Sequence, residues 1–220
     1  MMPSWAKRTL AFDTEASGTG ENARIIEFGA VVWEDGLKVV GLAWLINPGE
    51  LNMDDPEVRG AFEVNRINPE VLKDEPTFAE VFEEIKHVLE QSNVRVAHNA
   101  RFDQGLLRRE FARAVQSGLL KPEDAKRGSN TTLCTMALDY HLRPEPKGHS
   151  LAAVAERWGV PPWQSHRATC DAEAAARILH AMAPKLPIRL EDVVVAQKAA
   201  QAELEKIFAE RYGKKNNGRE

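Results

Sequence analysis

Thr9-Leu10-Ala11-Phe12-Asp13-Thr14-Glu15 is the stretch that decides the fold, because an uncharged run passes directly into a pair of acids. The run from Thr9 to Phe12 is typical of a buried strand. Side chains two residues apart along a strand point to the same side, so Asp13 and Glu15 face one point in space. Two like charges held there are unfavourable unless a cation joins them. Taken alone, the triplet is common, and an ordinary charged strand end is the simpler interpretation.

Two further apolar runs follow this first strand. Gly18 and Gly20 predict a loop after it, and the segments Ile25–Trp33 and Val39–Ile46 are rich in β-branched and apolar residues. Glu34-Asp35-Gly36 lies between the two runs, and Asp-Gly in that position is a strong hairpin signal. The first three strands are therefore expected to form an antiparallel meander.

The remainder of the chain alternates between helix and strand patterns. Residues 47–76 contain four prolines and little periodicity, which predicts a loop with short helical turns. The elements expected after it are a helix over 78–89 capped by Thr77, a strand over 94–97, a helix from Arg101, a strand over 131–135, and helices over 151–158 and 168–182. This order predicts an α/β fold with a mixed five-stranded sheet flanked by helices.

Length and composition limit the class of protein. The 220 residues suit one domain, expected over 1–185, with an extension over 186–220 that comprises an amphipathic helix at 191–212 and a polar tail. A net charge of −4 argues against a broad basic face for duplex binding. The two cysteines indicate no disulfide framework, and no apolar run approaches the roughly 20 residues of a membrane span. Neither a signal peptide nor a membrane contact is expected, and the predicted location is cytoplasmic.

Three more chemically active residues lie at the starts of helices. Asp103 falls in the first turn of the helix after the 94–97 strand, where the helix dipole alone favours an acid. Asp171 lies one turn into an alanine-rich helix, with His166 on the loop before it, and each alone fits a surface or capping role. Together with Asp13 and Glu15 they form an oxygen-rich set that suits Mg²⁺ or Mn²⁺. Two such ions roughly 3.5–4 Å apart can support phosphoryl displacement, with a histidine deprotonating the attacking water.

Three motifs resemble those of the DEDDh exonuclease family, which includes the proofreading subunit of the bacterial replicative DNA polymerase. They are Phe12-Asp13-Thr14-Glu15-Ala16-Ser17-Gly18, His98-Asn99-Ala100-Arg101-Phe102-Asp103 and His166-Arg167-Ala168-Thr169-Cys170-Asp171-Ala172. The resemblance runs from about residue 7 to 183 and implies a ribonuclease-H-like fold with two divalent metals. It implies that Asp13, Glu15 and Asp171 hold the first metal, that Asp13 and Asp103 hold the second, and that His166 is the general base.

Contacts to the substrate are less sharply marked. The family often has threonine directly after the motif glutamate, and this chain has Ala16, so a side-chain hydroxyl near the terminal sugar is lost. Ala16, Ser17, Gly18 and Asn99 are the expected contacts to the terminal nucleotide. Trp163 follows two prolines on the loop that leads to His166; it either stacks on a base or packs in the core.

The expected reaction is hydrolysis of the terminal phosphodiester at the 3′ end of nucleic acid, with single-stranded DNA favoured, to release nucleoside monophosphates. An RNA-trimming enzyme with the same chemistry is one alternative. A non-catalytic nucleic-acid-binding module is another, although such a module need not retain all five catalytic residues. The expected partners are 3′ ends and, through the C-terminal helix, a second copy of the chain or a polymerase.

Overall fold

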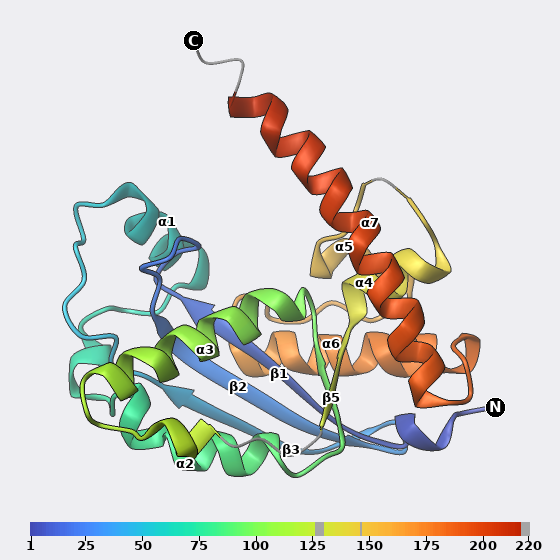
Figure 1. Ribbon diagram of the computed structural model, residues 1–220, viewed down its shortest axis with the longest axis horizontal. Helices are drawn as coiled ribbons and strands as arrows, with labels where there is room; N and C mark the ends of the chain where they lie inside the picture. Colours follow the sequence, from blue (N-terminus) through green and yellow to red (C-terminus); the bar gives the residue numbers. More distant parts are fainter. Residues whose placement is uncertain (126–129, 146, 217–220) are drawn as a thin grey trace.

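The sheet has five strands in the order β3-β2-β1-β4-β5 (Figure 1). The computed structural model describes residues 1–125, 130–145 and 147–216. The strands are β1 (Arg8–Ala16), β2 (Ile25–Glu34), β3 (Leu37–Leu45), β4 (Val94–Ala97) and β5 (Thr131–Cys134). The first three strands are antiparallel, whereas β1, β4 and β5 run parallel. The predicted meander and mixed sheet are confirmed.

The hairpin between β2 and β3 forms where the sequence predicts it. Asp35 and Gly36 both adopt positive φ angles, of 46° and 88°. Two successive left-handed residues match the right-handed twist of the paired strands, and Asp-Gly tolerates them well. Glu34 then pairs with Leu37 across the turn.

The helices agree with the sequence pattern in most places. They are α1 (Pro56–Asn65), α2 (Phe78–Leu89), α3 (Ala100–Gln116), α4 (Thr135–Leu142), α5 (Leu151–Arg157), α6 (Ala168–Met182) and α7 (Leu190–Asn216). Single 3₁₀ turns lie at Ser4–Ala6, Val71–Asp74, Pro122–Ala125 and Ala183–Lys185. Thr77 and Glu80 form the capping box expected at the start of α2.

The expectation of a loop with only short turns over 47–76 is wrong for α1, and α4 lay outside the expected elements. The only buried side chains of α1 are Phe62 and Asn65, so no apolar stripe marks it; Asp55 caps it and Pro56 occupies its first position. The helix α4 begins at Thr135, directly after Cys134, the last residue of β5, with no turn residue between the two elements. The sequence therefore offers no boundary that would reveal a second element.

Alternate side chains of β1 enter two separate cores. Ala11 packs in the cluster that contains the apolar face of α6, whereas Leu10 and Phe12 pack in the cluster that contains α2 and α3. Asp13 and Glu15 continue the series of Ala11, and they therefore face the side of the sheet covered by α6. Thr14 continues the series of Phe12 and faces α3.

The helix α7 packs on the domain from Val193 to Phe208, whose ring lies against His149. Val193, Ala200 and Leu204 are buried in the two cores. The Gln197 side chain adds two bonds to β5, because its oxygen accepts from the Cys134 N–H at 2.6 Å and its nitrogen donates to the Thr132 carbonyl at 3.2 Å. The C-terminal end of the helix extends away from the sheet (Figure 1). Within the described ranges, none of the helices has the length and apolarity needed to cross a membrane.

Gly29 on β2 permits the start of α6 to lie directly on the sheet. A Cβ at this position would be 2.2 Å from the Thr169 nitrogen and 2.3 Å from the Ala168 carbonyl carbon. Both contacts are with backbone atoms, which no rotamer change can relieve. The absence of a side chain at Gly29 thus sets how closely α6, and Asp171 on it, approaches β1 and β2.

We predict that Gly29→Ala lowers the thermal midpoint Tm by roughly 3–10 °C, because the added methyl group must push α6 off the sheet. Gly60 is the matched control: it lies inside α1, and a Cβ there meets no atom within 4 Å. Gly60→Ala should leave Tm unchanged or raise it slightly, since alanine is the better helix former by about 1 kcal/mol. Equal Tm values for wild type and Gly29→Ala, measured by thermal unfolding, would contradict the prediction.

Candidate active site

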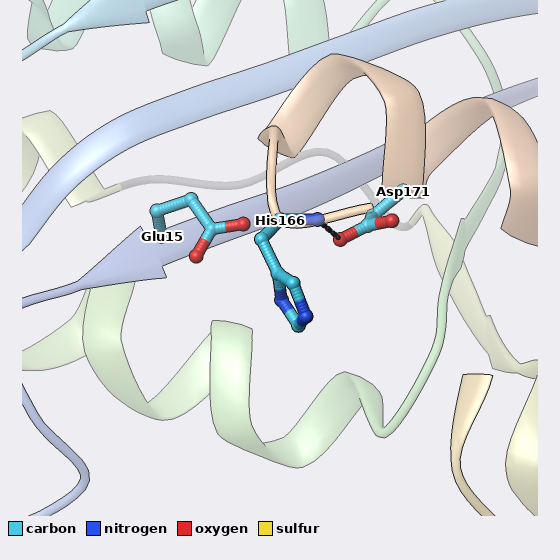
Figure 2. Close-up of side chains that lie close together, drawn as sticks. All are labelled: Glu15, His166 and Asp171. Atoms are coloured by element: carbon cyan, nitrogen blue, oxygen red, sulfur yellow. Dashed lines mark hydrogen bonds between the residues drawn. The ribbon is translucent and has the colours of Figure 1, made fainter. Parts of the chain in front are cut away.

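The four predicted acids come from three elements, and His166 comes from the loop before the third of them. Asp13 and Glu15 lie near the end of β1, Asp103 in the first turn of α3, and Asp171 in the first turn of α6 after the His166 loop. Glu15, His166 and Asp171 approach most closely: a ring nitrogen of the histidine and one oxygen of each carboxylate lie within 4.8 Å of one another. Figure 2 shows His166 between the two acids.

Asp103 is joined to β1 through Thr14. The Asp103 Oδ1 accepts hydrogen bonds from the Thr14 backbone nitrogen at 3.0 Å and from its hydroxyl at 2.7 Å. The Asp103 side chain is only 2% exposed. These two neutral donors hold the buried carboxylate of Asp103, on α3, against the strand that carries Asp13. The hydroxyl of Thr14, the middle residue of the Asp13-Thr14-Glu15 triplet, therefore has a structural role.

Asp171 holds the loop before its own helix. Its Oδ1 accepts from the Trp163 indole nitrogen at 2.5 Å, and its Oδ2 accepts from the His166 backbone nitrogen at 2.9 Å (Figure 2). His166 has a φ of 65°, a left-handed conformation that is uncommon for a residue other than glycine. The loop conformation that presents the imidazole is thus tied to the carboxylate of Asp171.

Glu27 anchors the start of α6 and was not singled out from the sequence. It lies opposite Glu15 on β2 and is 1% exposed. Its carboxylate accepts hydrogen bonds from the Arg167 guanidinium at 2.7 Å and the Ala168 backbone nitrogen at 3.0 Å. The signal in the sequence was a lone acid inside an otherwise apolar strand, since a buried charge requires a partner.

Burial raises the pKa of every acid in the cluster, and repulsion among the acids adds to it at Asp13 and Glu15. Burial raises the pKa of Asp13 well above its usual value, and repulsion from Asp103, Asp171 and Glu15 raises it further. Burial, followed by repulsion from Asp171, raises the pKa of Glu15 to about 7. Burial also raises the pKa of Asp103 to about 7, against the opposing effect of the Thr14 hydrogen bonds. Burial likewise raises the pKa of Asp171, opposed by the Trp163 and His166 bonds.

The donor chemistry of this cluster fits Mg²⁺ or Mn²⁺. Carboxylate oxygens are the ligands these ions prefer, and positive charge at this point would relieve the repulsion among the acids. Glu15 and Asp171 belong to the tight group with His166, and Asp13 lies close enough to both for their charges to act on it. The arrangement can concentrate positive charge at one spot beside an exposed histidine.

The residues expected to contact the terminal nucleotide surround the end of β1. Ser17 is buried, and its hydroxyl accepts a hydrogen bond from the Arg24 backbone nitrogen at 3.0 Å, which closes the loop after β1. Ala16 is half-buried and Gly18 lies against Glu57 of α1. Asn99 is exposed and adopts a φ of 56° as the N-cap residue of α3.

An α/β sheet of this order, with acids from three elements meeting at the end of β1, defines a class of nucleic-acid hydrolases. Residues 10–179 match the family model described as Exonuclease, RNase_T. The chain therefore belongs to this exonuclease family, and the resemblance to the DEDDh exonucleases is confirmed.

Similar curated proteins are much longer than this chain. It is 30% identical over 174 residues to a PolC-type DNA polymerase III of Clostridium perfringens and 30% identical over 171 residues to that of Bacillus subtilis. Each match covers 77% of this chain and 11% of the polymerase. The chain thus spans about a ninth of the length of these relatives.

Similar solved structures share the fold. Exonuclease X, in complex with 5′-overhanging duplex DNA, has a TM-score of 0.63 at 24% identity, covering 86% of this chain and 99% of that one. The nuclease domain of 3′hExo, a DEDDh family member bound to rAMP, has a TM-score of 0.63 at 17% identity, covering 83% of this chain and 94% of that one. The ribonuclease-H-like fold expected from the motifs is confirmed.

We predict that the metal-free protein loses stability as pH rises from about 4 to 7. The folded state keeps a proton on Asp103 up to about pH 7, whereas the unfolded chain releases it near the ordinary value of 3.8, so the free energy of unfolding falls across this window. Asp103→Asn keeps an oxygen for the Thr14 bonds and has no such proton. In EDTA at pH 8, the Tm of Asp103→Asn should exceed that of wild type by several degrees, because only the wild type then carries a buried charge at this position. At pH 5 the Tm difference should be smaller.

The control for this experiment is Asp54→Asn, at an exposed acid of the loop before α1. Its Tm should follow that of wild type at both pH values. A Tm difference between Asp103→Asn and wild type that is the same at pH 5 and pH 8 would contradict the assignment.

Proposed function

We propose that this chain is a metal-dependent 3′→5′ exonuclease that uses Asp13, Glu15, Asp103 and Asp171 as metal ligands and His166 as general base. The observation that carries the proposal is the convergence of these acids, from three separate elements, at the end of β1 beside the exposed His166 imidazole. A structural cluster would be expected to neutralise its acids with lysine or arginine. Here Arg167 pairs with the buried Glu27 and has only a minor effect on Glu15, so most of the negative charge of the cluster is left for ions from solution.

The acids divide between two ions. Asp13, Glu15 and Asp171 would hold one, and Asp13 together with Asp103 the other. Two Mg²⁺ or Mn²⁺ ions supply the positive charge that stabilises phosphoryl transfer. Thr14 keeps Asp103 in place for this role, and the two hydrogen bonds on Asp171 keep its oxygens oriented.

His166 would move the proton. A ring nitrogen of the exposed imidazole accepts the proton of the attacking water, while the backbone bond to Asp171 fixes the position of the residue. The loop from Ala16 to Gly18 and the α3 N-cap Asn99 would contact the terminal nucleotide, because they border the end of β1 at the same edge as the acids. The products are nucleoside monophosphates.

Single-stranded DNA is the proposed substrate. Support comes from the relatives, which are named as DNA polymerases, and from the exonuclease X structure, which was determined with DNA. The rAMP bound to 3′hExo favours RNA as the second candidate. The net charge of −4 fits an enzyme that grips a short end more than one that encloses a long duplex.

The helix α7 is proposed to complete the exonuclease domain as far as Phe208, beyond the boundary expected at residue 185. The burial of Val193, Ala200 and Leu204, the packing of Phe208 and the Gln197 bonds to β5 support this assignment. The part of the helix beyond Phe208 is available to a second copy or a polymerase.

The metal prediction uses 5′-labelled single-stranded DNA, duplex DNA and RNA oligonucleotides. Shortening from the 3′ end should stop in EDTA and return with Mg²⁺ or Mn²⁺, with the highest kcat/KM on single-stranded DNA.

Asp13→Ala should reduce kcat by more than about tenfold, equivalent to about 1.4 kcal/mol, while Asp54→Ala should not. Undiminished activity in excess EDTA would exclude the metal mechanism, and a higher kcat/KM on RNA would reassign the substrate. Binding without any shortening would indicate a non-catalytic module.

The general-base prediction concerns His166. His166→Ala should lower kcat by roughly 10²- to 10⁴-fold, with little change in the Mg²⁺ concentration needed for half-maximal rate. The acidic limb of the kcat–pH profile should flatten, because a base accepts a proton only in its neutral form. His141→Ala, at an exposed position of α4, is the control. A kcat for His166→Ala within threefold of wild type would remove His166 from the mechanism.

A further inference from the structure

The loop that carries His166 has few attachments to the rest of the protein. Between the end of α5 and the start of α6, residues 159–167 form neither helix nor strand. Most of its side chains, including that of His166, are exposed. A loop of this kind would be expected to move on fast timescales, which would spread the imidazole over many positions.

Trp163 and Val160 are the two half-buried residues of this loop. The Trp163 ring packs against the core cluster that contains α6 and lines a small cavity with Cys170 and Ala174 of that helix. Its indole N–H is used by Asp171. A side chain held at both its ring and its N–H is not free to stack on a base. Of the two roles that the sequence leaves open for Trp163, these contacts favour packing in the core over base stacking.

Asp171 therefore accepts one hydrogen bond on each oxygen, and both donors belong to the same loop. The Trp163 indole lies on Oδ1 and the His166 backbone on Oδ2. Hydrogen bonds to an ionised group are stronger than neutral ones, and two of them fix the carboxylate in rotation as well as in place. Fixing the carboxylate also fixes the backbone of His166, only three residues beyond Trp163.

We propose that Trp163 is a positioning residue for the exonuclease reaction, which holds the His166 imidazole at the metal site by clamping its loop to Asp171. This inference rests on the proposed role of His166 as general base. Trp163 touches neither substrate nor metal in this scheme. Its effect reaches the reaction through the Asp171 carboxylate and the His166 backbone.

The test is Trp163→Phe, which keeps an aromatic ring in the packed position and removes only the donor. The expected result is a fall in kcat of about 10- to 100-fold, the size of one lost hydrogen bond to a charged group, with KM within about twofold of wild type. Trp158→Phe is a closely matched control. The Trp158 indole also donates to a buried aspartate, Asp139 Oδ1, at 2.7 Å, in the α4–α5 region. It should lower Tm and leave kcat unchanged.

A double-mutant cycle separates positioning from a general structural role. If Trp163 acts through the imidazole, Trp163→Phe should change kcat by less than about threefold once His166 is alanine. An undiminished further loss in that background, or a wild-type kcat for Trp163→Phe alone, would overturn the proposal. So would a change confined to the Mg²⁺ midpoint, because it would place the effect on metal binding by Asp171 alone.

The same cycle distinguishes failure of this inference from failure of the proposed function. If His166→Ala alone keeps the wild-type kcat, the general-base assignment fails and the positioning role fails with it. If His166→Ala loses activity while Trp163→Phe does not, only the positioning role is wrong.

Discussion

The burial of several like-charged carboxylates at the end of β1 is the constraint on which the rest of the structure depends. Asp13 and Glu15 share one side of a strand, and Asp103 and Asp171 are brought to them by two helices. The pKa of each of the four acids is raised, chiefly by burial, and repulsion from neighbouring acids raises it further at Asp13 and Glu15. The fold must therefore hold these groups together against a force that would separate them.

The contacts that hold the acids are made almost entirely by neutral donors. A threonine hydroxyl and N–H bind Asp103, and an indole and a backbone N–H bind Asp171. Neutral donors orient a carboxylate without cancelling its charge. Arg167, the N-cap residue of α6, pairs with Glu27. This ion pair stabilises the start of the helix rather than the acids of the cluster. This division keeps the acids in position and leaves their charge available to metal ions.

The fold could be predicted where local rules and long-range packing agree. The β2–β3 hairpin follows from Asp35-Gly36, and α2 follows from its apolar stripe and the Thr77 cap, because both signals lie within a few residues of their consequence. The helix α1 carries no apolar stripe, and α4 is not separated from β5 by a boundary. The motif acids could be assigned as a set, yet the roles of Glu27 and Trp163 could not. Glu27 acts on a residue 140 positions away, and Trp163 acts through a hydrogen bond that has no periodic signature.

The acids and the histidine are supported in different ways, and this difference bears on the chemistry. The carboxylates lie on β1, α3 and α6, regular elements whose backbone is fixed by hydrogen bonds. Gly29 sets the distance between the start of α6 and the sheet. His166 stands on an irregular loop, exposed and at a positive φ. Ligands on regular elements keep their geometry when substrate is absent, so the cost of ordering them is met when the chain folds. A proton acceptor must instead follow the water it acts on, and a loop allows that adjustment. The hydrogen bonds on Asp171 connect the acids to the loop, because the same carboxylate belongs to the proposed metal site and limits how far the loop can move.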